Sequence, residues 1–187
     1  MARLETFADG VFAIAATLLV LDVRELGHWP SFVAYAVSFM TIGIMWLNHH
    51  QLMNQIGQVD RRFMVATLGL LMCIAFVPFP TRLLAERLTH DGARDAALAY
   101  GFTLTITAIF FSIVWFYAAR GRRLLREDSD PRVVAGISRS YLPGIGMYLT
   151  ATLVAFASPS ASAILYLVIA AVYVFESSIF GGAQSEH

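Results

Sequence analysis

Long apolar segments without charged residues at their centres recur along this chain, and they constrain its fold more than any other feature. The chain has no lysine, and its arginines, aspartates and glutamates lie at or between the ends of these segments. A bilayer core about 30 Å thick needs roughly 20 helical residues per crossing. The pattern therefore predicts six transmembrane helices, at about residues 4–23, 31–52, 63–81, 96–119, 140–157 and 160–175.

Composition excludes several other classes of protein. Only 14% of the 187 residues are charged, against roughly a quarter in soluble domains, which is too few to cover a soluble surface. The formal net charge is zero, so the basic field typical of nucleic-acid-binding proteins is missing and no nucleic-acid partner is expected. We expect one all-α integral membrane domain over residues 1–187, with membrane lipids as partners.

The placement of arginines predicts the orientation of the helices. Positive residues favour the cytoplasmic side of a membrane. With the N-terminus inside, nine of the 13 arginines lie in cytoplasmic segments and four in outer ones. Both termini are therefore expected in the cytoplasm of a multi-pass protein of the cell (inner) membrane. The basic loop 120–132, "RGRRLLREDSDPR", is the strongest indication, and it is interpreted as a topology anchor in preference to a lipid or ligand site.

Polar residues gather at the predicted cytoplasmic ends of the first two helices. Those of the first are Arg3 and Asp9, and those of the second lie in "MWLNHHQ": Trp46, Asn48, His49 and His50. An aspartate that accepts from an indole or imidazole N–H would form a satisfied buried network. Equally, the tryptophan could be an interfacial residue and the histidines could face headgroups. A metal site is disfavoured, because adjacent residues on a helix do not face one another and no third ligand is evident.

The first helix also carries an apolar stripe that points away from its polar end. At 100° per residue, Ile14, Leu18 and Leu21 share one face, with Thr17 at its edge. Asp9 lies about 140° away from Ile14. One face of this helix can therefore pack against the protein while the other face lines an open space. Packing against lipid or another helix remains the alternative, because this helix is apolar nearly all round.

Four short segments then resemble a known family. "RLETFAD" resembles the R-x-x-x-F-S-D signature that opens the first helix of the transmembrane protein 175 family of potassium channels. "VFAIAATLLVLD" is similar to the rest of that helix, "MWLNHHQ" to the second-helix Trp/His segment, and "FVPFPT" to the end of the third helix. The resemblance covers the six-span layout, and its specific motifs lie in the first 81 residues. Ala8 departs from it, because the family usually has serine there.

The resemblance implies an architecture and a pore. A chain with one set of six helices, like the bacterial members, implies a homotetramer whose first helices line a central pore without a carbonyl filter. Ile14 would form the tightest hydrophobic ring, Leu18 and Leu21 would form further layers, and Thr17 would offer hydroxyls to a partly dehydrated cation. In this reading Arg3, Phe7 and Asp9 are structural and fix the angle of the helix.

These observations predict a potassium-conducting channel with a modest preference for K⁺ over Na⁺. Asp22 and Glu25 would ring the outer mouth and concentrate cations. Conduction needs no cofactor or metal, only permeant K⁺, and no enzymatic activity is expected. The first alternative is a proton-linked transporter or proton leak that uses Asp9 with His49 or His50. A membrane enzyme or assembly factor is the second, although no nucleophile is paired with a base at a readable spacing.

Overall fold

The computed structural model describes residues 2–22, 29–88 and 90–181, and the regular elements in these ranges are helices. One isolated antiparallel bridge, between Ile56 and Leu125, is the exception within them. The helices run in the order α1 (Ala2–Leu18), η1 (Leu19–Asp22), α2 (Trp29–Asn54), α3 (Arg61–Phe76), α4 (Pro78–Arg87), α5 (Ala93–Ala119), η2 (Arg120–Arg122), α6 (Pro131–Val154) and α7 (Pro159–Gly181).

The third predicted segment ends later than its prolines suggest. Residues 63–81 were predicted to end at "FVPFPT", but α4 follows α3 directly and continues to Arg87. Pro78 lies in the first turn of α4, where a helix does not need the backbone N–H that proline lacks. Val77 keeps helical dihedral angles and its N–H bonds to the carbonyl of Ile74. The two prolines therefore begin a helix here and do not end the helical run.

The fifth predicted segment begins earlier than residue 140. Helix α6 starts at Pro131, because the carboxylate of Asp130 accepts a hydrogen bond of 2.7 Å from the backbone N–H of Arg132 and so caps the first turn. Pro143 is the fourth residue of the predicted segment 140–157, but it lies well inside α6.

Two helical stretches are long and apolar enough to cross a membrane by length and composition. These are Arg61–Arg87, which joins α3 and α4, and Ala93–Arg122, which contains α5. The shorter stretch Pro159–Tyr173 is also an apolar helix. The search behind this finding covers the described part of the chain only.

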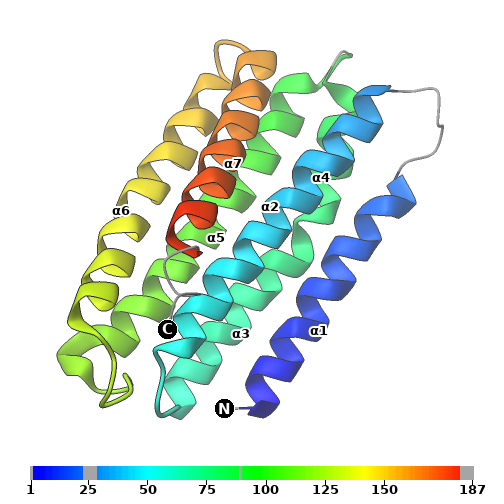
Figure 1. Cartoon of the computed structure of the whole chain (residues 1–187). Helices are drawn as coiled ribbons and strands as arrows, with labels where there is room; N and C mark the ends of the chain where they lie inside the picture. Colours follow the sequence, from blue (N-terminus) through cyan, green and yellow to red (C-terminus); the bar gives the residue numbers. More distant parts are fainter. Residues whose placement is uncertain (1, 23–28, 89, 182–187) are drawn as a thin grey trace.

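The helices form one bundle in which α1 occupies an edge (Figure 1). Helix α1 packs mainly on α3 and α2, while α5 packs on α3, α4 and α6. The start of α1 lies at the same end of the bundle as the α2–α3 and α5–α6 connections (Figure 1). This arrangement leaves one long side of α1 without a neighbouring helix among the described residues.

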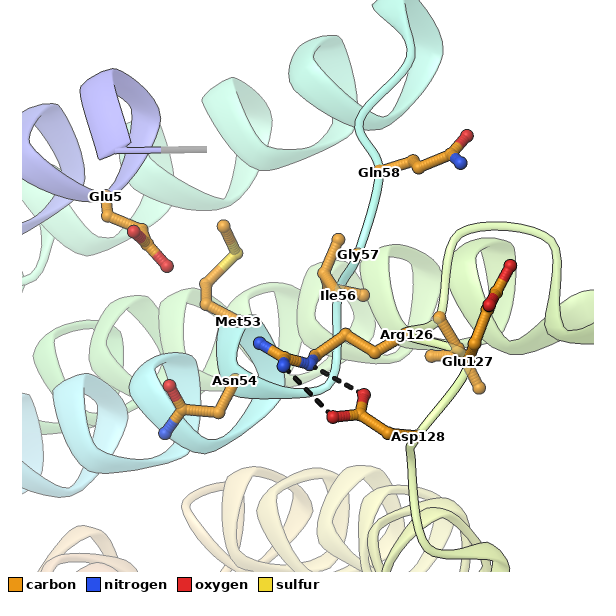
Figure 2. A pocket seen from close by; sticks show the side chains of 10 residues that line it. Glu5, Met53, Asn54, Ile56, Gly57, Gln58, Arg126, Glu127 and Asp128 are labelled. Atoms are coloured by element: carbon orange, nitrogen blue, oxygen red, sulfur yellow. Dashed lines mark hydrogen bonds and ion pairs between the residues drawn. The ribbon is translucent and has the colours of Figure 1, made fainter.

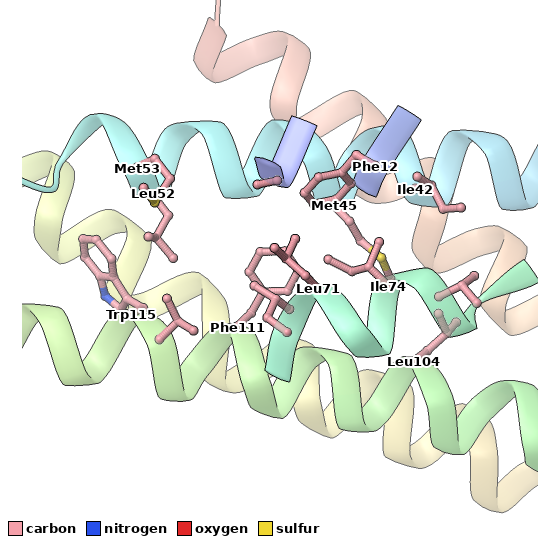
Figure 3. Packing of buried hydrophobic residues seen from close by; sticks show 14 of the residues in the cluster. Phe12, Ile42, Met45, Leu52, Met53, Leu71, Ile74, Leu104, Phe111 and Trp115 are labelled. Atoms are coloured by element: carbon pink, nitrogen blue, oxygen red, sulfur yellow. The ribbon is translucent and has the colours of Figure 1, made fainter. Parts of the chain in front are cut away.

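The core fills the space enclosed by α2, α3 and α5. Its largest fully buried side chains include Trp115, Phe63 and Leu70. Phe12 extends from α1 into this cluster beside residues of α2 and α3 such as Met45 and Ile74 (Figure 3). Close packing of this kind is the main force that joins helices in lipid, where burial from water contributes nothing. The core therefore attaches α1 to the bundle by one face only.

Candidate functional site on the first two helices

One face of α1 is packed against the rest of the chain. The buried residues on this face are Ala8, Phe12 and Ala15 of α1 and Leu19, which begins η1, and none is more than 3% exposed. Their spacing of four, three and four residues defines a single helical face. Ala8 is completely buried, so the position where the family usually has serine lies in a tight helix contact.

The other face of α1 is open. Ile14 is 61% exposed, and Phe7, Thr17 and Leu18 are also exposed. The Thr17 hydroxyl donates a hydrogen bond of 3.0 Å to the carbonyl of Ile14. The hydroxyl proton is therefore occupied within the helix, and the Thr17 oxygen can act only as an acceptor toward the open side. Of the predicted stripe, the structure places Ile14, Thr17 and Leu18 on this open face.

Asp9 and Trp46 join α1 to α2. The indole Nε1–H of Trp46 donates a hydrogen bond of 2.9 Å to Oδ1 of Asp9. The ring of His50 stacks on that indole, with centroids 5.7 Å apart and an interplanar angle of 20°. These three residues of the predicted cluster are therefore in contact, and they fix α1 at its N-terminal half.

His49 lies apart from this stack. Its ring packs on Phe12 with centroids 5.5 Å apart, and the residue is 2% exposed. Its Nε2 atom is buried and has no hydrogen-bond partner among the described residues. Arg3 and Asn48, which we predicted to join the network, make no side-chain hydrogen bond to any residue that the structure describes.

Three predicted residues near the end of the first helix lie beyond what the structure describes. Leu21 and Asp22 belong to η1, but only their backbone is described. Glu25 lies outside the described residues. The outer layer of the stripe and the acidic ring at the outer mouth therefore stay predictions.

Sequence reasoning missed a second cluster, at the end of the bundle where α1 begins. Asp60 accepts hydrogen bonds from the backbone N–H of Phe63 (2.7 Å), from the Tyr117 hydroxyl (2.6 Å) and from Nη2 of Arg123 (3.2 Å). The guanidinium of Arg123 also lies 4.8 Å from the centre of the Tyr117 ring. The hydrogen bond from Tyr117, above all, lowers the pKa of the Asp60 carboxyl below its ordinary value.

The basic loop is paired with the α2–α3 connection. The N–H of Gly57 donates to the carbonyl of Leu124 (2.8 Å), and the N–H of Arg126 donates to the carbonyl of Gln55 (2.9 Å). We call these backbone bonds and the Asp60 cluster together the loop clasp. Asp60 and Tyr117, which are in contact there, lie 57 positions apart in the sequence. No local pattern in the sequence could have indicated this contact.

An open groove of about 500 Å³ lies beside the loop clasp. Glu5 of α1 lines one side and the bidentate pair of Arg126 with Asp128 lines the other, at 3.0 and 3.1 Å (Figure 2). The described residues contain no group of three or more histidine, cysteine or acidic side chains that could hold a metal ion. Nothing in the groove pairs a nucleophile with a base.

Comparison with known proteins identifies the family. The chain is 39% identical over 191 residues to "Potassium channel Cha6605_3372" of Chamaesiphon minutus, and the match covers 94% of each chain. A model of the family described as "Endosomal/lysosomal potassium channel TMEM175" matches residues 3–78. The chain belongs to the TMEM175 family. The resemblance inferred from "RLETFAD" and the segments after it is thereby confirmed.

Further members and a solved structure agree with this assignment. "Potassium channel B446_29190" of Streptomyces collinus is 43% identical over 152 residues, 74% of this chain and 72% of that one. The crystal structure of a lysosomal potassium-selective channel TMEM175 homolog from Chamaesiphon minutus superposes with a TM-score of 0.85, at 37% identity over 94% of this chain and 97% of that one. A rat relative named "Endosomal/lysosomal proton channel TMEM175" is 30% identical over 83% of this chain and 36% of its own length.

Proposed function

We propose that this TMEM175 protein is a potassium-conducting channel of the cell membrane, assembled as a homotetramer of six-span subunits with both termini in the cytoplasm. The observation that carries the proposal is the exposed face of α1, because the described part of the chain leaves Ile14, Thr17 and Leu18 exposed. Four such faces around an axis would enclose a path lined by isoleucine, leucine and threonine. The names of the bacterial relatives support K⁺ as the permeant ion.

A hydrophobic ring of this kind works by controlling hydration. A narrow ring of Ile14 side chains would exclude ions by dewetting, and a wider one would hydrate and let them pass. K⁺ sheds water more readily than Na⁺, so a partly dehydrating ring favours K⁺ to a modest degree. The lone pairs of Thr17, one turn further along the pore, would ease that dehydration. Leu18 and Leu21 would add further apolar layers.

The polar end of α1 would then set the angle of the pore helix. The hydrogen bond between Trp46 and Asp9 fixes the helix on α2, while the packed face around Phe12 fixes its rotation. Together they would keep Ile14 turned toward the axis. We further propose that Asp22 and Glu25 surround the outer mouth and raise the local concentration of cations.

Ion flux into liposomes tests the function directly. The purified protein is reconstituted with opposed gradients of K⁺, Na⁺ and H⁺, and each flux is followed with an ion-specific dye. We expect K⁺ flux to exceed Na⁺ flux severalfold, with empty liposomes as the baseline. Flux of neither K⁺ nor Na⁺ above that baseline would contradict the proposal.

A second candidate function is proton conduction. Buried His49, with an unpartnered Nε2, and the name of the rat relative favour it. The contact between Asp9 and His50 works against a proton relay through that histidine, because it runs through the Trp46 indole, which donates a hydrogen bond and accepts none. A proton flux that disappears in the variant His49→Gln, in the same liposomes, would favour proton conduction over our proposal.

A further inference from the structure

The exposed face of α3 is an apolar stripe with an arginine at its N-terminal end. The exposed apolar residues of α3 are Met64, Val65, Leu68, Met72 and Phe76, each at least 39% exposed. At 100° per residue, all of them lie within about 60° of the direction of Arg61, which begins the helix. A guanidinium therefore stands at one end of a continuous apolar face, which we call the α3 stripe.

Helix α5 carries a matching stripe. Its exposed apolar residues are Phe102, Ile106, Ile109, Ile113 and Phe116, spaced alternately four and three residues apart. The next position in this series is Arg120, four residues after Phe116, and it is exposed as well. This second face, the α5 stripe, therefore also ends in a guanidinium.

The two stripes lie on either side of one helix seam. A Cβ atom on Gly69 of α3 would collide with the ring of Phe110 of α5, so these residues are in direct contact. Each of them lies about 80° from the centre of its own stripe. At one end of the seam, Asp60 binds Tyr117 and Arg123 and so joins the start of α3 to the end of α5. Arg61 and Arg120 therefore lie at the same end of neighbouring stripes.

No described residue neutralises the guanidiniums of Arg61 and Arg120. Neither makes an ion pair or a side-chain hydrogen bond within the described residues. Asp60, the carboxylate at the seam, is already occupied by its three donors. Guanidinium groups bind phosphate oxygens through paired N–H donors, so this end of the seam is suited to a phosphate group.

We infer that the seam between α3 and α5 binds an anionic phospholipid, with its phosphate held by Arg61 and Arg120 and its acyl chains along the two stripes. A second copy of the chain would have to place carboxylates opposite both arginines. An anionic lipid instead carries its phosphate directly above its own apolar chains, which is the order of groups along each stripe. The inference requires that the chain spans a membrane, as proposed above, but not that it conducts K⁺.

Retention of lipid by the full chain tests this inference. The protein is purified in a neutral detergent, incubated with phosphatidylglycerol or phosphatidylcholine, and bound lipid is counted by native mass spectrometry. We expect phosphatidylglycerol to be preferred, and the variant R61Q/R120Q to bind it about tenfold more weakly. The control R94Q/R132Q removes the same charge away from the seam and should change binding less than twofold.

Two results would overturn the inference. One is unchanged phosphatidylglycerol binding in R61Q/R120Q; the variant R61K/R120K, which keeps the charge and should keep most of the preference, shows whether any loss instead reflects misfolding. The other is a disulfide between subunits in a Leu68→Cys variant that also carries Cys73→Ser, because the seam would then be covered by a second copy. Protein that binds phosphatidylglycerol as predicted but passes no K⁺ would contradict only the proposed function.

Discussion

At the scale of single residues, the pairing of Asp9 with Trp46 is the contact that connects sequence to function. The sequence offered this pairing as one of two interpretations, because both residues lie near the same end of adjacent helices, while an interfacial Trp46 was the other. The sequence could not indicate that Arg3 and Asn48 remain outside the network, since that depends on side-chain directions set by packing. It also gave no indication of the Asp60 cluster, whose side-chain partners, Tyr117 and Arg123, come from a distant part of the chain.

Removing either member of the Asp9–Trp46 pair should loosen α1. We expect Trp46→Phe and Asp9→Ala each to lower the free energy of unfolding, with a coupling of about 1 kcal/mol between them, the usual net value of one hydrogen bond. Unfolding of the wild type, both single variants and the double variant in detergent measures the coupling. Strictly additive effects would mean that the two side chains do not stabilise each other.

Asp60 should make the stability of the loop clasp depend on pH. Its pKa is held below the ordinary value of 3.8, chiefly by the Tyr117 hydroxyl. A carboxyl with a depressed pKa stabilises the fold fully above its unfolded pKa, and this contribution is lost as the pH falls through the lower folded value. Asp60→Asn, which keeps the helix cap, should therefore lower the unfolding midpoint at pH 7, and the difference from wild type should shrink in acid below about pH 4.

The variant Asp128→Asn is the matched control for that experiment. Among the described residues, Asp128 pairs with Arg126 alone, two positions away in an exposed loop, and its side chain is 73% exposed. Exposed pairs of this kind contribute little to stability, so its unfolding midpoint should remain near that of the wild type. An Asp60→Asn variant that matches this control at every pH would contradict a stabilising role for the clasp.

At the scale of helices, the apolar segments predicted where the helices lie, but proline was the weak point of the prediction. Pro78 begins α4 and Pro143 lies within α6. The sequence alone does not say whether neighbouring helices will hold a helical run together across such a residue. The sequence also does not indicate where helices come into close contact. Gly101 of α5 gives the clearest example, because it lies against Tyr166 of α7 and Thr152 of α6.

A methyl group at Gly101 should therefore disturb the packing of three helices. Its Cβ would collide with the hydroxyls of Tyr166 and Thr152, which are hydrogen-bonded to each other at 3.2 Å. We expect Gly101→Ala to lower the free energy of unfolding by about 1–3 kcal/mol, the usual cost of overpacking. Gly146→Ala in α6 meets no atom within 4 Å and should be neutral or slightly stabilising. Equal effects of the two variants would contradict this account.

At the scale of the whole molecule, the sequence indicates the family through specific motifs in its first 81 residues. The sequence does not indicate how many copies of the chain assemble, since the exposed residues Ile14, Thr17 and Leu18 of α1 resemble any lipid-facing surface. The single chain leaves Ile14 exposed on an edge helix, and an aqueous path needs further copies of that helix. The proposed tetramer supplies them.

The mass of the assembled protein tests the tetramer. Light scattering on the detergent-solubilised protein, corrected for bound detergent, should give four times the chain mass of 20.6 kDa. The loss of half or more of the assembly in an Ile14→Arg variant is expected too, because four charges would face one another at the axis. A monomeric mass in several mild detergents would contradict the proposed tetramer, because a pore lined by α1 needs further copies of that helix.

The measurement that tests the account most directly compares two isoleucines of equal exposure. Ile14 on α1 is 61% exposed and Ile164 on α7 is 62% exposed, so Ile14→Asn and Ile164→Asn are matched in residue type and exposure. In K⁺ and Na⁺ flux into liposomes, Ile14→Asn should raise the flux of both ions and reduce the preference for K⁺, while Ile164→Asn should resemble the wild type. Unchanged flux and selectivity in Ile14→Asn would remove Ile14, and with it the exposed face of α1, from the conduction path.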